Sequence, residues 1–337
     1  NINMRKFGNT GMEIKRVGFG GIPIQRISQE DTNKVIDELE KCGVNFIDTA
    51  RGYTISEEYL GNALKGRREK FYIATKSMSR DYESMKKDIE ISLKNLQTDY
   101  IDLYQMHNVK PAEYDTIFGE DRAYRALLEA KEAGKIKHIG ITSHGLETVE
   151  KAVESGKFET IQFPYNIVEN QADEVFKKAH EKGVGTIVMK PLAGGAIDDG
   201  TLAMKYLLSR EYIDVAIPGM DSPQQVIENT DVLQNYELTE EDNKKIAKIK
   251  SELGTNFCRR CEYCLPCPKG INIPQNFLLE GYYNRYNLKD WAVDRYRGLA
   301  ENERASNCIE CGACQKKCPY ELPIIDMLKK VVDTLEK

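Results

Sequence analysis

Short apolar runs alternate with longer amphipathic stretches along most of the chain, from Val17 to about Asn235. Short runs bounded by turn residues predict buried strands, and apolar residues repeated every three or four positions predict helices that bury one face. The strands are expected at Val17–Gly20, Val44–Asp48, Phe71–Thr75, Tyr100–Gln105, His138–Thr142, Thr160–Phe163, Thr186–Met189 and Val215–Ile217. The helices that follow them are expected at Glu30–Cys42, Ser56–Lys65, Tyr82–Asn95, Asp121–Glu132, Leu146–Glu154, Ala172–Glu181, Leu202–Ser209 and Pro223–Gln234.

This regular alternation predicts an α/β protein in which eight βα units close into a (β/α)8 TIM barrel. Glycines stand where helices are expected to end in a left-handed residue, at Gly43, Gly66, Gly134, Gly156 and Gly183. The alternative is an open, doubly wound sheet, which needs a Gly-x-Gly-x-x-Gly turn after its first strand. The segment Gly18-Phe19-Gly20-Gly21 does not match that turn, so the barrel is favoured.

Two further segments flank the predicted barrel. Met4–Phe7 and Ile14–Arg16 surround Gly8-Asn9-Thr10-Gly11, which indicates a small β-hairpin that covers the bottom of the barrel. Glu240–Leu253 is an amphipathic helix with Thr239 as its N-cap, and Gly254-Thr255 marks a boundary. We therefore expect a barrel domain over residues 4–254 and a smaller domain over residues 255–337.

Composition narrows the classes of function. The chain has 337 residues, of which 41% are hydrophobic, so it can bury the core of a barrel and of a small second domain. Its 48 basic and 53 acidic residues give a net charge of −5, which argues against nucleic acid as a partner. It contains no apolar run long enough to span a membrane and does not begin with a signal sequence. We expect a cytoplasmic protein without a membrane partner.

Eight of the nine cysteines lie after residue 257, in two tight groups. In a protein without a secretion signal, this distribution indicates metal binding in a reducing compartment rather than disulfides. The groups are Cys258-x2-Cys261-x2-Cys264-x2-Cys267-Pro268 and Cys308-x2-Cys311-x2-Cys314-x3-Cys318-Pro319. Structural zinc is the alternative, but zinc sites usually place two Cys-x-x-Cys pairs on either side of a longer loop. Four thiolates within about ten residues favour an iron–sulfur cluster in each group. The ninth cysteine, Cys42, is expected to be a buried apolar residue in a helix.

The second cysteine group resembles the bacterial ferredoxin motif, whose fourth cysteine ligates the other cluster. The resemblance implies two [4Fe-4S] clusters, in a domain where Ile273–Tyr286 and Asp290–Ala300 are expected to be helical. It also implies that each cluster takes three cysteines from one group and one from the other. One cluster would use Cys258, Cys261, Cys264 and Cys318, and the other Cys267, Cys308, Cys311 and Cys314. The shorter final gap of the first group leaves this crossing open. The choice between electron-transfer clusters and purely structural ones is also open.

Three predicted strands end in reactive side chains, and strand ends at the C-terminal face of a barrel are where barrel enzymes place their chemistry. Asp48 ends the second strand and is followed by Tyr53, Lys76 follows the third strand, and His107 follows the fourth. A tyrosine hydroxyl with a pKa near ~10 needs a neighbouring cation to exchange protons near neutrality. Lys76 would supply that charge, Asp48 would anchor Lys76, and His107 would orient a substrate carbonyl. Taken one at a time, each of these residues also has an ordinary structural role.

The order and spacing of these four residues resemble the catalytic tetrad of the aldo-keto reductases. Further matches are Gly18-Phe19-Gly20, Gly140-Ile141-Thr142-Ser143-His144, Gln162, Ile217-Pro218-Gly219 and Glu228-Asn229, and the resemblance covers roughly residues 4–250. It implies that NADP or NAD binds along the top of the barrel, with Ser143, His144 and Gln162 at the nicotinamide carboxamide. The other expected cofactor contacts are Gly20, Lys190, Pro218, Gly219, Gln225, Glu228 and Asn229.

The chain also departs from that family. Gly219 and Gln225 stand where the family often has cations that bind the 2′-phosphate of NADPH, which should weaken a preference for NADPH. Met189 stands where the family often stacks a tyrosine on the nicotinamide. Lys190, which follows Met189, is either a phosphate or substrate contact or a partner in a surface ion pair.

The sequence therefore predicts an oxidoreductase that acts on a carbonyl or alcohol group of a small molecule, with Tyr53 as proton donor. Electrons would pass through the two clusters, through NAD(P)H, or through both, and a redox carrier such as ferredoxin would be the protein partner. Since a hydride carries two electrons and a cluster passes one, direct coupling needs a splitting cofactor such as flavin or a radical reaction, and no flavin motif is recognisable. Three alternatives stay open: an NAD(P)H carbonyl reductase with structural clusters, a non-redox iron–sulfur enzyme, and an electron-transfer protein on an inactive barrel.

Overall fold

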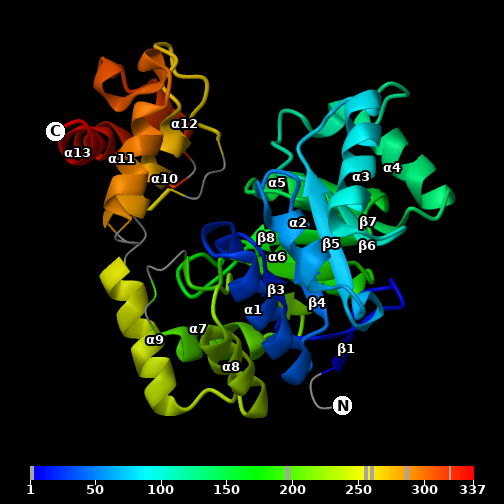
Figure 1. Ribbon diagram of the computed structural model, residues 1–337. Coiled ribbons are helices and arrows are strands. Elements are labelled where there is room, and N and C mark those ends of the chain that lie inside the picture. Colours follow the sequence, from blue (N-terminus) through cyan, green and yellow to red (C-terminus); the bar gives the residue numbers. More distant parts are fainter. Residues whose placement is uncertain are drawn as a thin grey trace. The chain divides into compact units, whose positions relative to one another are not determined.

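The computed structural model describes residues 4–193, 197, 199–253, 257–258, 262–284, 288–318 and 320–337. The chain divides into two compact units (Figure 1). One contains residues 1–192 and 199–246, and the other contains residues 193–198 and 247–337. In the described residues, no helix is both long and apolar enough to cross a membrane.

The first unit is a (β/α)8 barrel, as the alternating pattern predicts. Eight parallel strands are hydrogen-bonded in chain order from β3 to β10. Isolated parallel bridges, Val17 to Ala216 and Gly20 to Gly219, join the first strand segment to the last and close the ring. The strands are β3 (Phe19–Gly20), β4 (Phe46–Asp48), β5 (Tyr72–Ser77), β6 (Ile101–Met106), β7 (Ile136–Thr142), β8 (Thr160–Pro164), β9 (Gly185–Met189) and β10 (Val215–Ala216).

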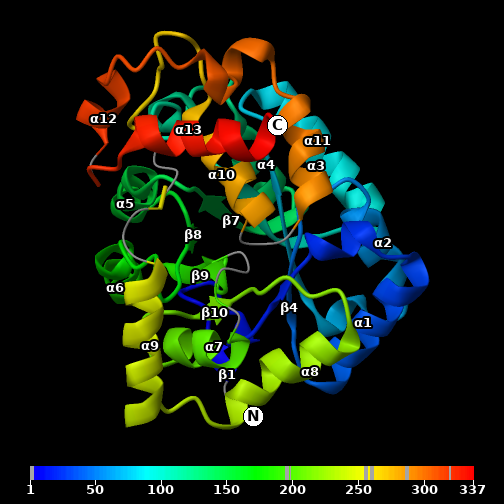
Figure 2. The same cartoon turned by 90° about the vertical axis from the view of Figure 1, so that its left-hand side faces the viewer.

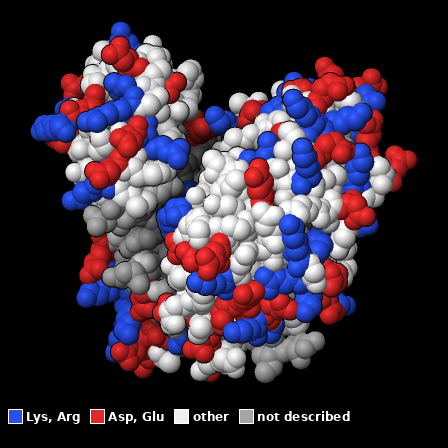
Figure 3. Space-filling model, viewed as in Figure 1, with Lys and Arg blue, Asp and Glu red and all other residues white. Residues whose placement is uncertain are grey.

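Each strand is followed by an outer helix. These helices are α1 (Gln29–Lys41), α2 (Ser56–Ala63), α3 (Tyr82–Leu96), α4 (Ala123–Glu132), α5 (Leu146–Ser155), α6 (Asp173–Glu181), α7 (Gly200–Leu208) and α8 (Pro223–Asp231), and α9 (Glu240–Leu253) comes after them (Figure 2). Helix α4 begins two residues later than expected, because Arg122 is extended and acts as its N-cap. On the face shown in Figure 3, basic and acidic side chains are interspersed.

The N-terminal hairpin packs against the barrel interior. Strands β1 (Met4–Lys6) and β2 (Glu13–Lys15) pair in antiparallel fashion. Phe7, Met12 and Ile14 are buried in one cluster with strand residues that include Phe46 and Ile187. The turn needs glycine at position 8, where φ is +51° and a Cβ would lie 2.4 Å from the backbone nitrogen of Gly185. Burial of a side chain such as Phe7 contributes about 2–3 kcal/mol, so the hairpin is part of the barrel core.

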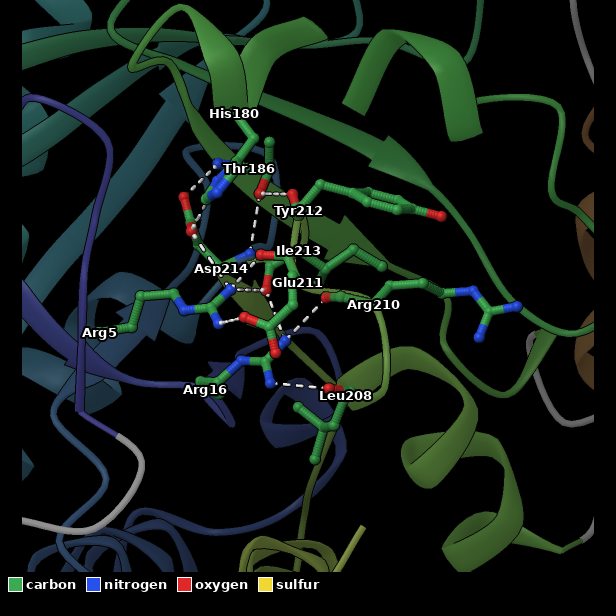
Figure 4. Close-up of polar contacts among 10 residues, drawn as sticks. All are labelled: Arg5, Arg16, His180, Thr186, Leu208, Arg210, Glu211, Tyr212, Ile213 and Asp214. Carbon is green, nitrogen blue, oxygen red and sulfur yellow. Dashed lines mark hydrogen bonds and ion pairs between the residues drawn. The ribbon is translucent and has the colours of Figure 1, made fainter. Parts of the chain in front are cut away.

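Two arginines from the N-terminal segment fix the loop that leads into β10 (Figure 4). Arg16 is 2% exposed, and its guanidinium donates to the carbonyl oxygens of Leu208, Arg210 and Ile213, at 2.7, 3.0 and 2.7 Å. Arg5 also donates to the carbonyl of Ile213, at 2.9 Å. A planar guanidinium carries five N–H donors in a rigid fork and can bind several carbonyls at once, whereas an ammonium has three donors on a single nitrogen.

The second unit is a small helical assembly. Its helices are α10 (Ile273–Asn284), α11 (Lys289–Arg297), α12 (Ala313–Lys317) and α13 (Ile324–Leu335). The first two agree with the helices expected from the sequence, whereas α12 and α13 were not predicted. Yet α13 has a clear helical period, since Ile324, Leu328, Val331 and Leu335 all lie in the core of this unit.

We predict that Arg16→Lys lowers the free energy of unfolding of the barrel by about 2–3 kcal/mol, because buried carbonyls lose charge-assisted hydrogen bonds. Urea denaturation followed by circular dichroism measures the change. The matched control is Arg26→Lys, since the Arg26 side chain is 61% exposed and pairs with Asp221 on the surface. The control should change the free energy by less than about 0.5 kcal/mol. Equal effects of the two substitutions would contradict this account of Arg16.

Candidate active site and cysteine cavities

The four candidate catalytic residues come from three neighbouring strands. Asp48 is the last residue of β4, Lys76 lies near the end of β5, and His107 directly follows β6. Tyr53 lies in the loop between β4 and α2, which is fixed to the next strand by the hydrogen bond from the Arg51 nitrogen to the Lys76 carbonyl, at 2.9 Å. Because parallel strands present their C-terminal ends at the same edge, these residues meet at the top of the barrel.

Asp48 and Lys76 form an ion pair in the barrel interior, where each side chain is 2% exposed. The Lys76 ammonium also donates to the Thr49 carbonyl at 3.0 Å. Burial acts to lower the pKa of Lys76, but the Asp48 carboxylate and the Tyr53 hydroxyl outweigh it, so the pKa of Lys76 is raised. Lys76 is therefore a cation throughout the physiological range.

Two glutamines support the same carboxylate. Asp48 Oδ1 accepts from Gln105 Nε2 at 2.9 Å and from Gln162 Nε2 at 3.2 Å, and Gln162 also donates to Gln105 Oε1 at 3.0 Å. A buried ion pair is stable only where its remaining hydrogen-bonding positions are also satisfied. These amides satisfy them. The sequence reasoning missed Gln105, although a glutamine inside an apolar strand, two residues before His107, was a usable signal.

Tyr53 lies between the cation and the histidine. Lys76 Nζ is 4.7 Å from the centre of the Tyr53 ring, and the rings of Tyr53 and His107 meet edge to face with their centres 6.0 Å apart. The structure thus brings all four candidate residues together.

His107 is a neutral imidazole in this setting. Burial, followed by the charges of Lys76 and Arg80, lowers the pKa of His107 from 6.5 to about 2. Its Nδ1 atom is buried and has no hydrogen-bond partner among the described residues. The chain around it is held by Arg80, whose Nη2 donates to the His107 carbonyl at 2.6 Å. A neutral imidazole can donate one hydrogen bond to a substrate oxygen without giving up a full proton.

The three residues expected at the nicotinamide carboxamide each have a different hydrogen-bond partner within the barrel. The Ser143 hydroxyl donates to the Val109 carbonyl at 2.6 Å, and the Gln162 amide is directed at Asp48. His144 Nδ1 lies 2.8 Å from Asn108 Oδ1. Because that oxygen can only accept, Nδ1 is the donor of this hydrogen bond.

Asn108 was not singled out from the sequence. It directly follows His107 and has a φ of +50°, and its backbone nitrogen donates to Thr142 Oγ1 at 2.9 Å. Thr54, Lys190 and Ala193 also have positive φ angles in loops at strand ends. Strained residues of this kind often cluster at functional sites.

The other expected cofactor contacts lie at the seam of the barrel and after it. The Gly20 nitrogen donates to the Pro218 carbonyl at 3.0 Å, and a Cβ on Gly20 would lie 2.8 Å from the carbonyl of Ile217, so glycine permits ring closure. The Lys190 carbonyl accepts from Asn166 at 3.0 Å. Gln225 Oε1 accepts from the Asp221 nitrogen at 2.7 Å, and Glu228 accepts from Gln224 at 3.1 Å. Gly219 is exposed after β10, and Asn229 is half-buried on α8.

The described cysteines of the second unit surround two separate cavities. One is lined by Cys258, Cys264 and Cys318, together with Ile273, Phe277, Leu322 and Ile324. The other is lined by Cys267, Cys308, Cys311 and Cys314, together with Ile271, Ile273, Ile325 and Leu328. Cys261 lies outside the described residues. Among those that are described, no three Cys, His, Asp or Glu side chains are placed to hold a single metal ion.

The thiol chemistry and the local backbone suit an iron–sulfur cluster. In the second group, Glu310 and Gly312 have φ angles of +57° and +76°, which bend the segment between Cys308 and Cys314 around its cavity. The Glu310 nitrogen donates to Cys308 Sγ at 3.4 Å, a contact that stabilises a thiolate. Each cavity thus receives cysteines from both groups, and its other walls are mainly apolar.

Comparison with known proteins identifies both units. The sequence model of the Aldo/keto reductase family matches residues 16–201, which is more than half of the chain. The chain belongs to the aldo/keto reductase family. Its C-terminal residues 257–323 match the 4Fe-4S dicluster domain, so this member of the family carries an iron–sulfur domain.

Several relatives agree with this assignment. L-galactose dehydrogenase from Arabidopsis thaliana is 27% identical over 75% of this chain and 94% of its own length. Methylglyoxal reductase DkgA from Escherichia coli is 29% identical over 68% of this chain and 88% of its own length. Among solved structures, the holo form of the aldo-keto reductase AKR11C1 from Bacillus halodurans has a TM-score of 0.65 and 26% identity, covering 74% of this chain and 96% of that one. This aldo/keto reductase is an oxidoreductase.

We predict that His107 makes the barrel less stable in acid. Since the pKa of His107 is about 2 in the folded chain and about 6.5 when unfolded, only the unfolded chain takes up this proton between those values. The free energy of unfolding should therefore fall as the pH drops below 6.5. Between pH 6.5 and 4.5 the loss is about 2 kcal/mol.

Urea denaturation across this pH range measures the effect. The variant His107→Gln should lose that part of the pH dependence, whereas His180→Gln, which removes a half-exposed histidine of the same unit, should keep it. Identical pH profiles for the original chain and His107→Gln would show that His107 is not buried as a neutral group.

We also predict that Asn108 sets the tautomer of His144. Asn108→Asp keeps an acceptor beside Nδ1, whereas Asn108→Gly removes it and suits the positive φ angle better than asparagine does. The imidazole nitrogen shifts of His144, measured by NMR, should keep the Nδ1-protonated pattern in Asn108→Asp and lose it in Asn108→Gly. If the glycine variant keeps this pattern, the tautomer has another cause.

Proposed function

We propose that the barrel reduces a carbonyl group of a small molecule, or oxidises the corresponding alcohol, with Tyr53 as the proton donor and acceptor. The observation that carries the proposal is the buried Asp48–Lys76 ion pair beside Tyr53, next to a neutral His107. The names of two relatives, a dehydrogenase and a reductase, agree with chemistry in either direction.

Each residue has a defined task in this proposal. His107 donates a hydrogen bond to the substrate oxygen and holds it beside the Tyr53 hydroxyl. Tyr53 gives its proton to that oxygen, and the Lys76 ammonium stabilises the tyrosinate that remains. Asp48, held by Gln105 and Gln162, keeps Lys76 charged and in place. Bound NAD(P)H would supply the hydride that arrives at the substrate carbon.

The contacts to nicotinamide are part of the same proposal. We infer that the cofactor lies along the top of the barrel, near His144 and Lys190 and the loop after β10. Neither Gly219 in that loop nor Gln225 on α8 is a cation, and Gln225 already accepts a hydrogen bond from the Asp221 nitrogen. This arrangement favours NADH over NADPH, since binding of a 2′-phosphate gains most from charge-assisted contacts.

For the second unit we infer two [4Fe-4S] clusters with crossed ligands. Cys258, Cys261, Cys264 and Cys318 would bind one cluster, and Cys267, Cys308, Cys311 and Cys314 the other. The linings of the two cavities support this pairing. Each cluster passes one electron. Ile273 lines both cavities, so a short apolar wall separates the two positions. Thiolate ligands of this type favour a reducing compartment such as the cytoplasm.

One observation favours a second candidate function. Most of the described cysteines pack into or against the hydrophobic core of their unit, beside side chains such as Phe277 and Leu328. Small domains often rely on metal groups for stability. In this candidate the barrel is a nicotinamide-dependent carbonyl reductase, and the clusters only hold the small domain together.

We predict that Tyr53→Phe lowers kcat/KM for carbonyl reduction by about 10²–10⁴, because it removes the proton donor. The dissociation constant for nicotinamide should stay the same. Steady-state kinetics with small aldehydes and fluorescence titration with NADH measure the two effects. Tyr59→Phe removes a hydroxyl from the adjacent helix α2 and serves as the control, which should keep full activity. Full activity of Tyr53→Phe would refute the proposed role of Tyr53.

An anaerobic titration distinguishes the two candidate functions. Iron and sulfide content and EPR spectra are followed while NADH, NADPH or dithionite is added to the purified protein. About eight irons per chain are expected for two clusters. Reduction of the clusters by a nicotinamide, alone or with added flavin, supports one electron path. Turnover with nicotinamide while the clusters respond only to dithionite supports the structural role.

A further inference from the structure

The two cysteine cavities differ in how much of their wall is exposed. The cavity of Cys258, Cys264 and Cys318 is bounded mainly by buried or half-buried side chains. In the other cavity, Pro268, Lys269, Ile309 and Cys311 are exposed, and Ile309 has 60% of its surface in contact with solvent. Among the described cysteines that line the two cavities, Cys311 is the exposed one, and it brings the second position to the surface of the unit.

The exposed edge has an apolar centre and a basic rim. Ile309 stands beside Cys311, while Lys269 lines the cavity and Lys317 donates to the Pro266 carbonyl at 3.5 Å. Lys316 is the exposed neighbour of Lys317 on α12. The acid of this edge, Glu310, is paired with Lys329 at 2.6 Å. Within the described part of the chain, Lys269, Lys316 and Lys317 are bound to no acid, so the rim is positive.

We propose that this edge, formed by Lys269, Ile309, Cys311, Lys316 and Lys317, is the docking surface for an acidic one-electron carrier protein. It rests on the proposed function in one respect, namely that the unit binds two clusters. The cluster position at Cys267, Cys308, Cys311 and Cys314 is then the one that exchanges electrons with the carrier. In each transfer the carrier loses one electron and the cluster gains it, or the reverse, and no bond forms or breaks.

The physical reasons are distance and charge. Electron transfer requires close approach of two redox groups, and an exposed ligand allows a partner to come within contact of the site. A basic rim around an apolar centre attracts an acidic surface from a distance and then buries Ile309. The apolar side chain of Ile309 is 60% exposed to water in the unbound chain, which is unfavourable. Docking of a partner would remove this apolar surface from water and so stabilise the complex.

The test uses the cluster-loaded chain, reduced with dithionite and freed of excess reagent. Stopped-flow absorbance follows its oxidation by ferricyanide, a small anion, and by a plant-type [2Fe-2S] ferredoxin chosen for its negative charge. The variants are Lys269→Glu with Lys317→Glu, and Ile309→Glu. Lys269 and Lys317 are also reversed one at a time, and Lys289→Glu on α11 of the same unit is the charge-matched control for these single variants. Iron content and midpoint potentials are measured for every variant.

We expect two phases of oxidation, of which the faster belongs to the exposed position. At low ionic strength, the double lysine variant should slow the faster phase at least tenfold with both oxidants, and the difference should shrink at 0.5 M salt. Ile309→Glu should slow it with the protein carrier, and Lys289→Glu should leave it unchanged. Midpoint potentials should shift little, which separates a docking effect from a damaged cluster.

Three results would overturn the proposal. The first is a loaded chain whose fast phase is unaffected by either variant. The second is an equal effect of the control, which would indicate only the net charge of the unit. The third is oxidation by ferricyanide that depends on the rim while the acidic carrier neither binds nor reacts. Absence of iron in the original chain would instead refute the dicluster function on which the proposal rests, and the two failures are therefore distinguishable.

Discussion

The chemistry of the barrel depends on one buried ion pair. Transfer of a carboxylate and an ammonium from water into a protein interior costs several kcal/mol per ion, and the pair is tolerated only where every remaining donor and acceptor is satisfied. Lys76 meets this condition through Asp48 and the Thr49 carbonyl, and Asp48 meets it through Gln105 and Gln162. These side chains come from β4, β5, β6 and β8. The ion pair therefore needs a ring of strands around it, and an open sheet could not supply all of its partners.

The same cation gives the two neighbouring aromatic residues different tasks. A positive charge stabilises a tyrosinate, and it disfavours protonation of an imidazole. Lys76 is named among the causes that hold the pKa of His107 near 2, after burial itself. In the proposed chemistry Tyr53 can therefore exchange a proton with the substrate, while His107 can only offer a hydrogen bond. One charge, held beside Tyr53 by Asp48, separates the acid from the orienting group.

Much of this arrangement could be predicted from the sequence. The contacts that could not be predicted depend on strand register and on loops, which the pattern of apolar residues does not specify. The βα alternation and the rule that barrel chemistry lies at strand ends were enough to single out Asp48, Lys76 and His107. The amide contacts of Gln105 and Gln162 depend on strand register, which an apolar pattern does not specify. The bond between Asn108 and His144 joins two loops and has no periodic signal. By contrast, α13 was not predicted, although its apolar repeat is regular.

The second unit raises the question of how many electrons the proposed clusters can hold. Reduction of a carbonyl consumes two electrons, whereas a single cluster passes one, so a dicluster unit holds the number that one turnover requires. The two cavities share Ile273 as a wall, and among the described cysteines that line them Cys311 is the exposed one. Because the exposed Cys311 lets an outside carrier come close to its cavity, we expect the proposed cluster there to be filled first and the other one through it. A purely structural pair of clusters has no need for such an asymmetry, and the basic rim around Ile309 has no role in holding the core together.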